Sequence, residues 1–504
     1  MKNLLTILLL FQWTFFIAQT EVEPKINAEV NYLNYDAFFE SDELNVNPVL
    51  PNLSKPYQPG YRLPWVSKQE KYKDNYLHIF PVVNVLGSFK NDGNSTYSAN
   101  FGAGLGITTQ LSKKFYARLL LTGNAFQREG SNLDYSSIFR SDFWEESNNS
   151  TTLSIQPRFR MSFSPYEFLN IQAGVDQHFI GQGNRSMLLG DYGAPYPFVQ
   201  LRTKIWKLEM VNIYQFFKEN ENTQLTRKFA STHFFNFNAT DRFQIGVFET
   251  VVFAPKDTLL NRGYEVEYLN PFLFYRPTEY GLGSQDRLLI GLNTSYQFDR
   301  FMVYGQFALD EFVLKELVDR TRWWANKYSG QIGIKGKRNL TKGQLRWQTE
   351  LNFARPFTYS HINESTNYGN QGRPLAHPLG SNFVEIYTQS SMHFNSNFTL
   401  TGRFFFVQQG GADGNDSISY GSDVYQSYTD RPKEYGYKIG GDGQVNRFHF
   451  SVEGSYRISE KLMIDAFIRP GVELNNMAQK NYNTHFMVFG GIRTSLWNER
   501  SFSF

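Results

Sequence analysis

From about residue 75 onward, apolar and polar residues alternate along the chain with a period of two. Residues 101–111 place phenylalanine, alanine, leucine or isoleucine at almost every second position, and residues 345–353 alternate leucine, tryptophan and phenylalanine with polar residues. A β-strand sends successive side chains to opposite faces, so the pattern predicts strands with one apolar and one polar face. The same pattern recurs at 288–298, 448–458 and 486–496.

The connections between these segments are alternately short and long. Soluble sandwiches also alternate, so the faces alone do not place the chain in a membrane. In an up-and-down antiparallel barrel of the outer-membrane type, every short turn lies at one rim and every long loop at the other. Short turns are predicted at 112–114, 164–167, near 207, and at 238–242, 298–300, 337–344, 395–397 and 459–461. Longer polar connections are predicted at 127–149, 181–197, 218–228, 254–286, 310–327, 355–382, 408–442 and 474–484.

The segments between these connections add up to about eighteen strands, an even number within the bacterial range. A barrel of this size is too wide for inward side chains to fill, so the polar faces enclose water and the apolar faces contact lipid. We therefore predict an all-β fold, a transmembrane antiparallel up-and-down β-barrel whose long surface loops can plug the lumen. Aromatic residues near strand ends are expected to form interfacial girdles, with a core role in a soluble sheet as the alternative; they are Tyr296, Phe298, Trp347 and Trp497.

The N-terminal residues have the features of a secretory signal peptide. Lys2 precedes an apolar stretch from Leu4 to Ile17, and the small residue Ala18 follows, which predicts a signal peptide at 1–18. Residues 19–74 are expected to form a periplasmic extension, because the run at 47–65 is too rich in proline for a continuous helix or a central strand. The barrel is expected to span 75–504, in the outer membrane.

Composition excludes several kinds of partner and cofactor. The net charge is +3 among 50 basic and 47 acidic residues, which gives no reason to expect nucleic acid as a partner. The chain has no cysteine, so disulfides, a lipoprotein anchor and thiolate metal sites are excluded. The expected partners are outer-membrane lipid and the ligand of the surface loops.

The stretch GQGNRSMLLGDYGAPYP at 181–197 has the spacing of two glycines found in phosphate loops. A dinucleotide fingerprint needs a third glycine three places on and a helix that aims its N-terminus at the pyrophosphate. That position is Ser186, and two prolines stand where the helix would run. We expect no nucleotide and no other cofactor.

No set of residues has the spacing of a catalytic or metal site. The 8 histidines are scattered and none forms HExxH or another metal-ligand pattern. His361 and His377 share one loop with Ser360, but no strained nucleophile turn singles out a serine. We therefore expect that the protein is not an enzyme.

Function is expected in the long loops of such a scaffold. In 310–327, apolar residues at helical spacing predict a short helix packed in or over the lumen. Trp323 and Trp324 could stack on sugar rings, or could belong to an interfacial belt, and Tyr192 and Tyr196 have the same two interpretations. The candidate glycan-binding residues are Tyr192, Tyr196, Arg276, Asp310, Trp323 and Trp324.

Four segments resemble the Wzi-type capsule assembly proteins, especially the branch of gliding bacteria. They are GQGNRSMLLGDYGAPYPFVQL at 181–201, EYLNPFLFYRPTEYGLGSQDRLLIGLN at 267–293, FALDEF at 307–312 and RPLAHPLGSNFVEI at 373–386. The resemblance implies an eighteen-stranded outer-membrane barrel whose loops bind exported capsular polysaccharide and hold it at the cell surface. Better-known members carry a periplasmic helical bundle, and the proline-rich 47–65 run does not resemble one.

The leading hypothesis is therefore an outer-membrane barrel that binds capsular or exopolysaccharide through its surface loops. Such binding would serve capsule assembly and retention, or adhesion and gliding motility, since relatives in gliding bacteria are tied to surface motility. Two alternatives remain open, a diffusion pore or transporter, and an accessory component of a gliding or secretion machine with gliding or export proteins as partners.

Overall fold

The structure is a computed structural model, and the elements below are those of its described residues. These are residues 61–62, 76–91, 95–112, 114–129, 144–147, 151–221, 224–255, 263–271, 286–394, 397–411, 418–459, 462, 464–477 and 482–494. The expected signal peptide, nearly all of the expected N-terminal extension, Arg276 and Trp497 lie outside them.

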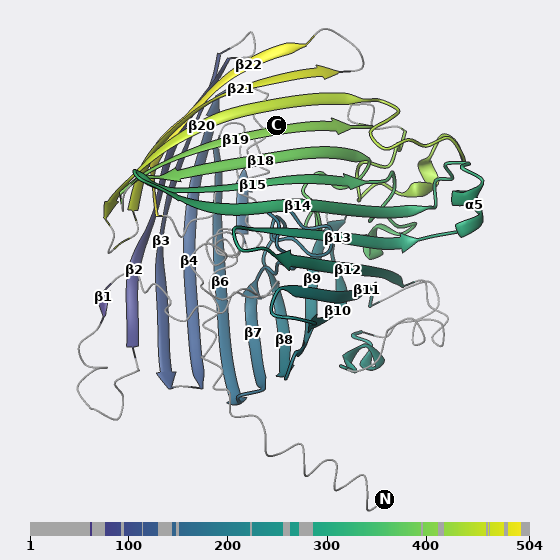
Figure 1. The fold of residues 1–504 in the computed structure, drawn as a ribbon, viewed down its shortest axis with the longest axis horizontal. Coiled ribbons are helices and arrows are strands. Elements are labelled where there is room, and N and C mark those ends of the chain that lie inside the picture. The colour runs from purple at the N-terminus through teal and green to yellow at the C-terminus, as the bar shows by residue number, and fades with distance from the viewer. Residues whose placement is uncertain are drawn as a thin grey trace, which may run out of the picture.

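One antiparallel sheet forms the body of the molecule (Figure 1). It holds 20 strands; β1 (Tyr61–Arg62) and β5 (Trp144–Ser147) are short additions, and the other eighteen close into a barrel. The closing strands β2 and β22 pair from Asn84 opposite Arg493 to Asn91 opposite Phe486. The predicted all-β, eighteen-stranded transmembrane barrel is confirmed. Its strands are β2 (Tyr76–Asn91), β3 (Ser95–Ser112), β4 (Phe115–Glu129), β6 (Thr151–Tyr166), β7 (Leu169–Asp176), β8 (Tyr196–Ile205), β9 (Leu208–Glu221), β10 (Gln224–Asn238), β11 (Phe243–Phe253), β12 (Arg287–Gln297), β13 (Phe301–Glu311), β14 (Lys327–Leu340), β15 (Gly343–Ala354), β18 (Phe383–His393), β19 (Phe398–Gln409), β20 (Val445–Ser459), β21 (Ile464–Met477) and β22 (Asn483–Thr494).

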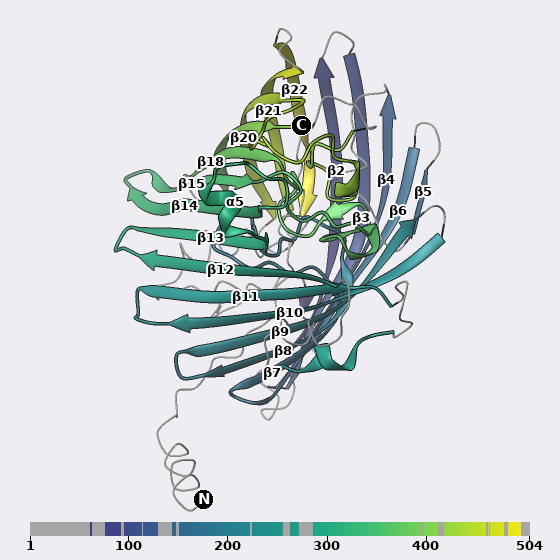
Figure 2. The same cartoon turned by 90° about the vertical axis from the view of Figure 1, so that its right-hand side faces the viewer.

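The strands tilt strongly relative to the barrel axis. In Figures 1 and 2 the strands of one wall, β2 to β6, therefore cross the direction of those in the facing wall. Few other elements are present in the described residues. They are the helix α5 (Leu314–Val318), the 3-10 helices η3 (Val266–Leu269), η4 (Glu364–Thr366) and η5 (Tyr428–Asp430), and the strand pair β16 (Gly369–Asn370) and β17 (Arg373–Pro374).

Apolar side chains face outward from the barrel, as the alternation predicts. In β3, Phe101 and Leu105 are exposed, whereas their neighbours on the other face are mostly buried. Tyr296 and Phe298 are also exposed, with ring centroids 4.7 Å apart, at the end of β12 where an interfacial girdle is expected. An exposed apolar outer face is stable only in contact with lipid, which fits the transmembrane fold.

In the described part of the chain, the short turns and long loops lie close to the predicted positions except at 218–228 and at 474–484, where β21 and β22 pair as far as Asn475 opposite Asn483. We call the barrel end that carries the short turns, such as 206–207 between β8 and β9, the short-turn rim, and the other end the long-loop rim. The predicted long connection at 218–228 is wrong, because β9 and β10 continue as a ladder until Glu221 opposite Gln224. Apart from Leu225, the residues of 218–228 are polar, so no alternation marks them as strands.

No described helix is long and apolar enough to cross a membrane.

The largest hydrophobic cluster lies inside the barrel. It joins inward residues of β8 to β13 and of β15, β18 and β19 to residues of three long connections, which include Leu188, Tyr359 and Val424. The lumen is therefore filled by chain along this arc of the wall, and those loops form the candidate site.

Candidate functional site in the lumen and at the long-loop rim

The connection between β7 and β8, residues 177–195, turns into the lumen, and we call it the plug loop. Met187 and Leu188 are fully buried. The loop is compact, because Ile180 N donates to Leu189 O at 2.9 Å and Ser186 Oγ donates to Ile180 O at 2.7 Å. No helix follows the glycines of this loop, all of whose residues are described, so the nucleotide geometry is missing.

Glutamines on the inner wall hold the plug loop through its backbone. Gln306 of β13 donates from Nε2 to Ile180 O at 2.8 Å, and its Oε1 accepts from Met187 N at 2.8 Å. Gln331 of β14 donates from Nε2 to Arg185 O at 2.9 Å. The polar face predicted to meet water thus supplies the hydrogen-bond partners of a buried loop, as buried backbone groups require.

Two glycines allow the plug loop to approach its neighbours closely. Gly181 has a φ of 142°, in the region that favours glycine, and a Cβ there would meet the side chain of Gln306. A Cβ at Gly190 would lie 2.4 Å from Ala376 O. The glycine spacing of this stretch therefore serves close packing against the wall and a second loop.

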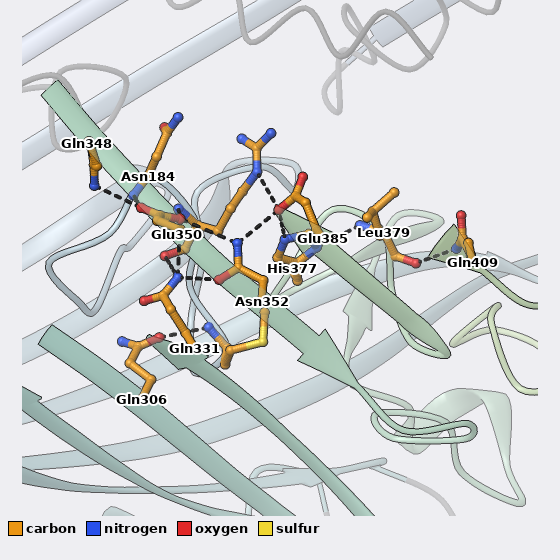
Figure 3. Close-up of polar contacts among 12 residues, drawn as sticks. Asn184, Gln306, Gln331, Gln348, Glu350, Asn352, His377, Leu379, Glu385 and Gln409 are labelled. Carbon is orange, nitrogen blue, oxygen red and sulfur yellow. Dashed lines mark hydrogen bonds and ion pairs between the residues drawn. The ribbon is translucent and has the colours of Figure 1, made fainter. Parts of the chain in front are cut away.

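Glu350 of β15 binds the tip of the plug loop (Figure 3). Its carboxylate accepts from Asn184 N and, at 3.3 Å, from Arg185 N. Tyr304 OH and Gln348 Nε2 also donate to it, each at 2.8 Å. Several hydrogen bonds offset the cost of burying a carboxylate, and removing its partners would leave an uncompensated buried charge.

Glu385 of β18 joins the plug loop to the long connection between β15 and β18, residues 355–382, which we call the cover loop (Figure 3). His377 Nε2 of the cover loop lies 2.9 Å from Glu385 Oε2, and Arg185 Nε of the plug loop lies 3.6 Å from the same oxygen. His377 Nδ1 accepts from Leu379 N at 3.2 Å, so the proton resides on Nε2 and is donated to Glu385. Burial holds the pKa of His377 below its usual range, which fits a neutral imidazole.

The two loops also pack directly on each other. Tyr359 OH donates to Met187 O and Tyr368 OH donates to Leu188 O, both at 2.7 Å. Gly190 N donates to Leu375 O at 2.7 Å. The plug and cover loops therefore pack together as one unit, which side chains of β13, β14, β15 and β18 hold by hydrogen bonds and ion pairs.

The opposite arc of the inner wall carries charged side chains. Glu453 of β20 accepts from Arg493 of β22 at 2.6 Å and from Arg403 of β19 at 3.3 Å, and Arg469 of β21 lies 3.7 Å away. The side chains of Arg403 and Arg493 are 26% and 17% exposed, so water reaches this arc. None of these residues belongs to the hydrophobic cluster of the loops.

The histidines and the serine of the cover loop do not form a catalytic set. His361 Nδ1 lies 2.6 Å from Thr366 Oγ1, His377 pairs with Glu385, and Ser360 Oγ donates to Phe357 O at 2.8 Å. Burial, with the nearby positive charges of Arg287 and Lys327, lowers the pKa of His361 to about 3. Among the described residues, no group of three or more histidines and acidic residues could hold a metal ion.

The structure separates the predicted glycan-binding residues into buried and accessible ones. Tyr196 is 3% exposed, and its hydroxyl accepts from Gln215 Nε2 at 2.9 Å. Asp310 is buried in an ion pair with Arg287 and also accepts from Tyr359 N at 3.1 Å. Both support the packing of the loops, and a glycan could reach neither without a rearrangement.

Tyr192 is half-buried against the cover loop. Arg373 NH1 donates to its hydroxyl at 2.6 Å, and the guanidinium carbon of Arg373 lies 5.0 Å from the ring centroid. Arg276 lies outside the described residues. Tyr192 thus contacts Arg373 of the cover loop, whereas the ring of Trp324 contacts Phe357 and Tyr428.

Trp323 and Trp324 lie at the long-loop rim, in the segment between β13 and β14. Trp324 is 8% exposed, and the guanidinium carbon of Arg431 lies 4.1 Å from its ring centroid. Trp323 is only half-buried. Of the tryptophan pair, Trp323 is thus the one that a sugar could contact.

The segment 418–444, between β19 and β20, pairs with the tryptophan segment, and we call it the rim loop. Trp324 N donates to Glu434 O at 3.0 Å, and Gly436 N donates to Thr321 O at 3.1 Å. Tyr435, between these residues, is 53% exposed. The sequence predicted a long connection at 408–442, but no candidate binding residue was assigned to it, although its aromatic-rich run YQSYTDRPKEYGY at 425–437 is a visible signal.

The sequence matches no profile of a known protein family and no curated protein. Among solved structures, the chain is similar to Wzi, an outer-membrane protein involved in group 1 capsule assembly in Escherichia coli and a carbohydrate-binding β-barrel. The two sequences are 11% identical, and the alignment covers 81% of this chain and 84% of that chain with a TM-score of 0.50. It also aligns with OprD of Pseudomonas aeruginosa, at 9% identity over 86% and 98% of the two chains and a TM-score of 0.42. OccAB1 of Acinetobacter baumannii aligns at 10% identity over 84% and 98%, with a TM-score of 0.41. Likeness at such identities shows the fold alone, and that fold is an eighteen-stranded barrel of the outer-membrane type.

Proposed function

We propose that the protein is an outer-membrane barrel that binds surface polysaccharide through its long-loop rim and is not an enzyme. The N-terminal signal peptide would direct its export, and the long-loop rim would face the cell exterior. The bound polymer would be capsular or exopolysaccharide, held for capsule assembly and retention or for adhesion and gliding.

The observation that carries this proposal is the aromatic and polar surface that the closed loops present at the rim. Trp323 and Tyr435 lie on two segments joined by backbone hydrogen bonds, so their separation is fixed. Asp430 and Glu434 are exposed beside them, and Arg431 lies between the two acidic residues in the chain. Aromatic faces with flanking hydrogen-bonding groups suit a sugar, which has apolar ring faces and hydroxyl edges.

Two further points support binding rather than transport as the main role. The plug and cover loops fill the lumen along the arc from β8 to β19, where an open pore would contain water. The fold is also similar to that of Wzi, a carbohydrate-binding barrel. The resemblance of the loop segments to Wzi-type proteins adds to this, including the branch of gliding bacteria.

A diffusion pore is the second candidate, and one observation favours it. The arc from β19 to β22 carries Arg403, Arg493 and Glu453, and its arginines remain partly exposed to the interior. A water-filled passage along this arc would conduct ions past the plug and cover loops.

Deletion of the gene in the host bacterium separates these functions. If the protein binds polysaccharide, deletion cells will lose surface polysaccharide into the medium. The wild-type gene will restore retention in these cells, and the Trp323→Ala, Tyr435→Ala double variant will not. The matched control is Trp206→Ala, since Trp206 is 58% exposed at the short-turn rim. A spreading assay on agar reports adhesion and gliding, including any role with gliding or export proteins.

Normal retention in the deletion strain, together with lost solute uptake, would overturn the proposal in favour of the pore. Planar bilayers give the complementary measurement. Steady conductance of the purified wild-type protein supports a pore, and a closed barrel supports a binding protein.

A further inference from the structure

The segment from Phe312 to Arg320, around α5, is apolar and exposed. Phe312, Val313, Leu314, Leu317 and Val318 are between 40% and 69% exposed, and no residue of α5 is buried. The helix predicted for 310–327 is therefore present, but the prediction that it packs in or over the lumen is wrong. Apolar residues gathered on one exposed segment mark a contact surface.

The residue of this segment that contacts the rest of the protein is acidic, not apolar. Glu316 is the half-buried residue of the segment 312–320, in which the other residues are exposed. Its carboxylate accepts from Thr321 Oγ1 at 2.7 Å, and Thr321 N donates to Glu316 O at 3.2 Å. Leu314, Leu317 and Val318, spaced three and four residues apart, share one face. An amphipathic helix at a water-exposed surface turns its apolar face toward the protein, so an outward apolar face indicates an apolar environment.

The apolar face continues the lipid-facing surface of the barrel. Phe307 of β13 is 42% exposed and Ile332 of β14 is 58% exposed on the outer face, and α5 lies between these two strands in the chain (Figures 1 and 2). Phe312 follows Phe307 by only a few residues, so about 15 Å of extended chain separates them. This reach allows the helix to rest in the headgroup layer next to the hydrocarbon band.

The charges of the segment suit a membrane surface. Within 312–320, Lys315 and Arg320 are exposed, against one exposed acidic residue, Asp319, and Arg322 is exposed just after the segment. On the other side, the segment is preceded by Glu311, whose side chain is 43% exposed and pairs with Lys327. Basic residues around an apolar helical face are typical of helices that lie in the interfacial layer, where anionic headgroups attract them.

We propose that the segment 312–320 is a lipid-binding anchor, which rests its apolar face in the outer interfacial layer of the membrane. It would hold the adjoining Trp323 at a fixed height above the lipid surface. The inference depends on the transmembrane fold and not on polysaccharide binding, so each can fail alone.

The test uses the absence of cysteine from the chain. Single cysteines replace Leu317 and, in a second variant, Val318, and each carries an environment-sensitive fluorophore in phosphatidylcholine vesicles. Controls are Phe307→Cys on the lipid-facing wall and Tyr435→Cys on the rim loop. Quenching by lipids with a doxyl group near the headgroup or deep in the acyl chain is compared with quenching by aqueous iodide.

We expect labels at Leu317 and Val318 to show blue-shifted emission, strong quenching by the shallow doxyl lipid and loss of iodide quenching. Added phosphatidylglycerol should strengthen the doxyl quenching at low salt, an effect that Lys315→Gln with Arg320→Gln should abolish. Labels that iodide quenches as strongly as at Tyr435 would overturn the proposal. Labels shielded from iodide without doxyl quenching would also overturn it, because a second copy or another protein would then cover the face.

Discussion

Replacement of Glu350 by glutamine is predicted to release the plug loop. The carboxylate accepts from two amides of this loop, Asn184 N and Arg185 N. Glutamine keeps one acceptor, removes the charge and turns an N–H toward these donors. Hydrogen bonds to a charged group contribute about 1.5–3 kcal/mol and neutral ones about 0.5–1.5 kcal/mol. Losing one of these two hydrogen bonds and weakening the other therefore destabilises the closed loop by about 3 kcal/mol. This corresponds to a roughly 100-fold rise in the population of the open loop.

Thiol labelling measures this open population directly. Met187 is fully buried in the plug loop and the chain has no other thiol, so Met187→Cys reacts with a water-soluble maleimide only after the loop opens. When reclosing is fast, the labelling rate follows the open fraction. We expect labelling about 100-fold faster when Glu350→Gln is added to Met187→Cys.

The matched control is Glu453→Gln, in the same Met187→Cys background. Glu453 is also a buried luminal carboxylate, but its partners Arg403, Arg469 and Arg493 lie on wall strands. Equal rates for Glu350→Gln and the unmodified background would refute the role of Glu350 as the latch. An equal acceleration by Glu453→Gln would refute it as well, since the effect would then come from a loosened barrel.

Three further predictions use the same labelling or amide exchange. Gly190→Ala should accelerate labelling at Met187→Cys by about tenfold or more. The added Cβ would lie 2.4 Å from the carbonyl oxygen of Ala376 in the cover loop, and overpacking costs about 1–3 kcal/mol. Gly193→Ala is the control and should change little, because the nearest atom to its added Cβ, Pro374 O, is 3.6 Å away. Burial lowers the pKa of His377 in the closed loop, so the open loop binds more protons and closure weakens as the pH falls below 6.5. The labelling rate, normalised to that of an exposed cysteine, should therefore rise toward about pH 5. A flat pH profile would contradict this role of His377. Arg320, two residues after the end of α5, has a φ of 53°, a position where glycine is usual. Arg320→Gly should therefore slow amide exchange in the last turn of α5 about fivefold. Faster exchange would show that the helix end is not strained.

The barrel could be predicted because its signal is local. Alternation in β3 and β15, together with the rhythm of turns and loops, depends only on neighbours in the chain. The exposure of Tyr296 and Phe298 at a strand end follows from the same pattern. The error at 218–228 has the same origin, since this almost entirely polar stretch has no alternation that would mark it as strand.

The closure of the lumen could not be worked out from local patterns. Met187 N meets Gln306 at a separation of 119 residues, and Tyr368 OH meets Leu188 O at a separation of 180. Inward polar residues such as Gln306 fit a water-filled lumen and a lumen filled by loops equally well. Trp324 is buried by Arg431 from a distant loop, so its sequence alone does not distinguish a sugar contact from a core position.

Binding of the host's purified surface polysaccharide to the protein in vesicles tests the central claim most directly. The account predicts saturable binding that the Trp323→Ala, Tyr435→Ala double variant loses and that Trp206→Ala retains. Binding that survives the double variant, or a folded wild-type barrel that binds no surface polysaccharide of its host, would contradict it.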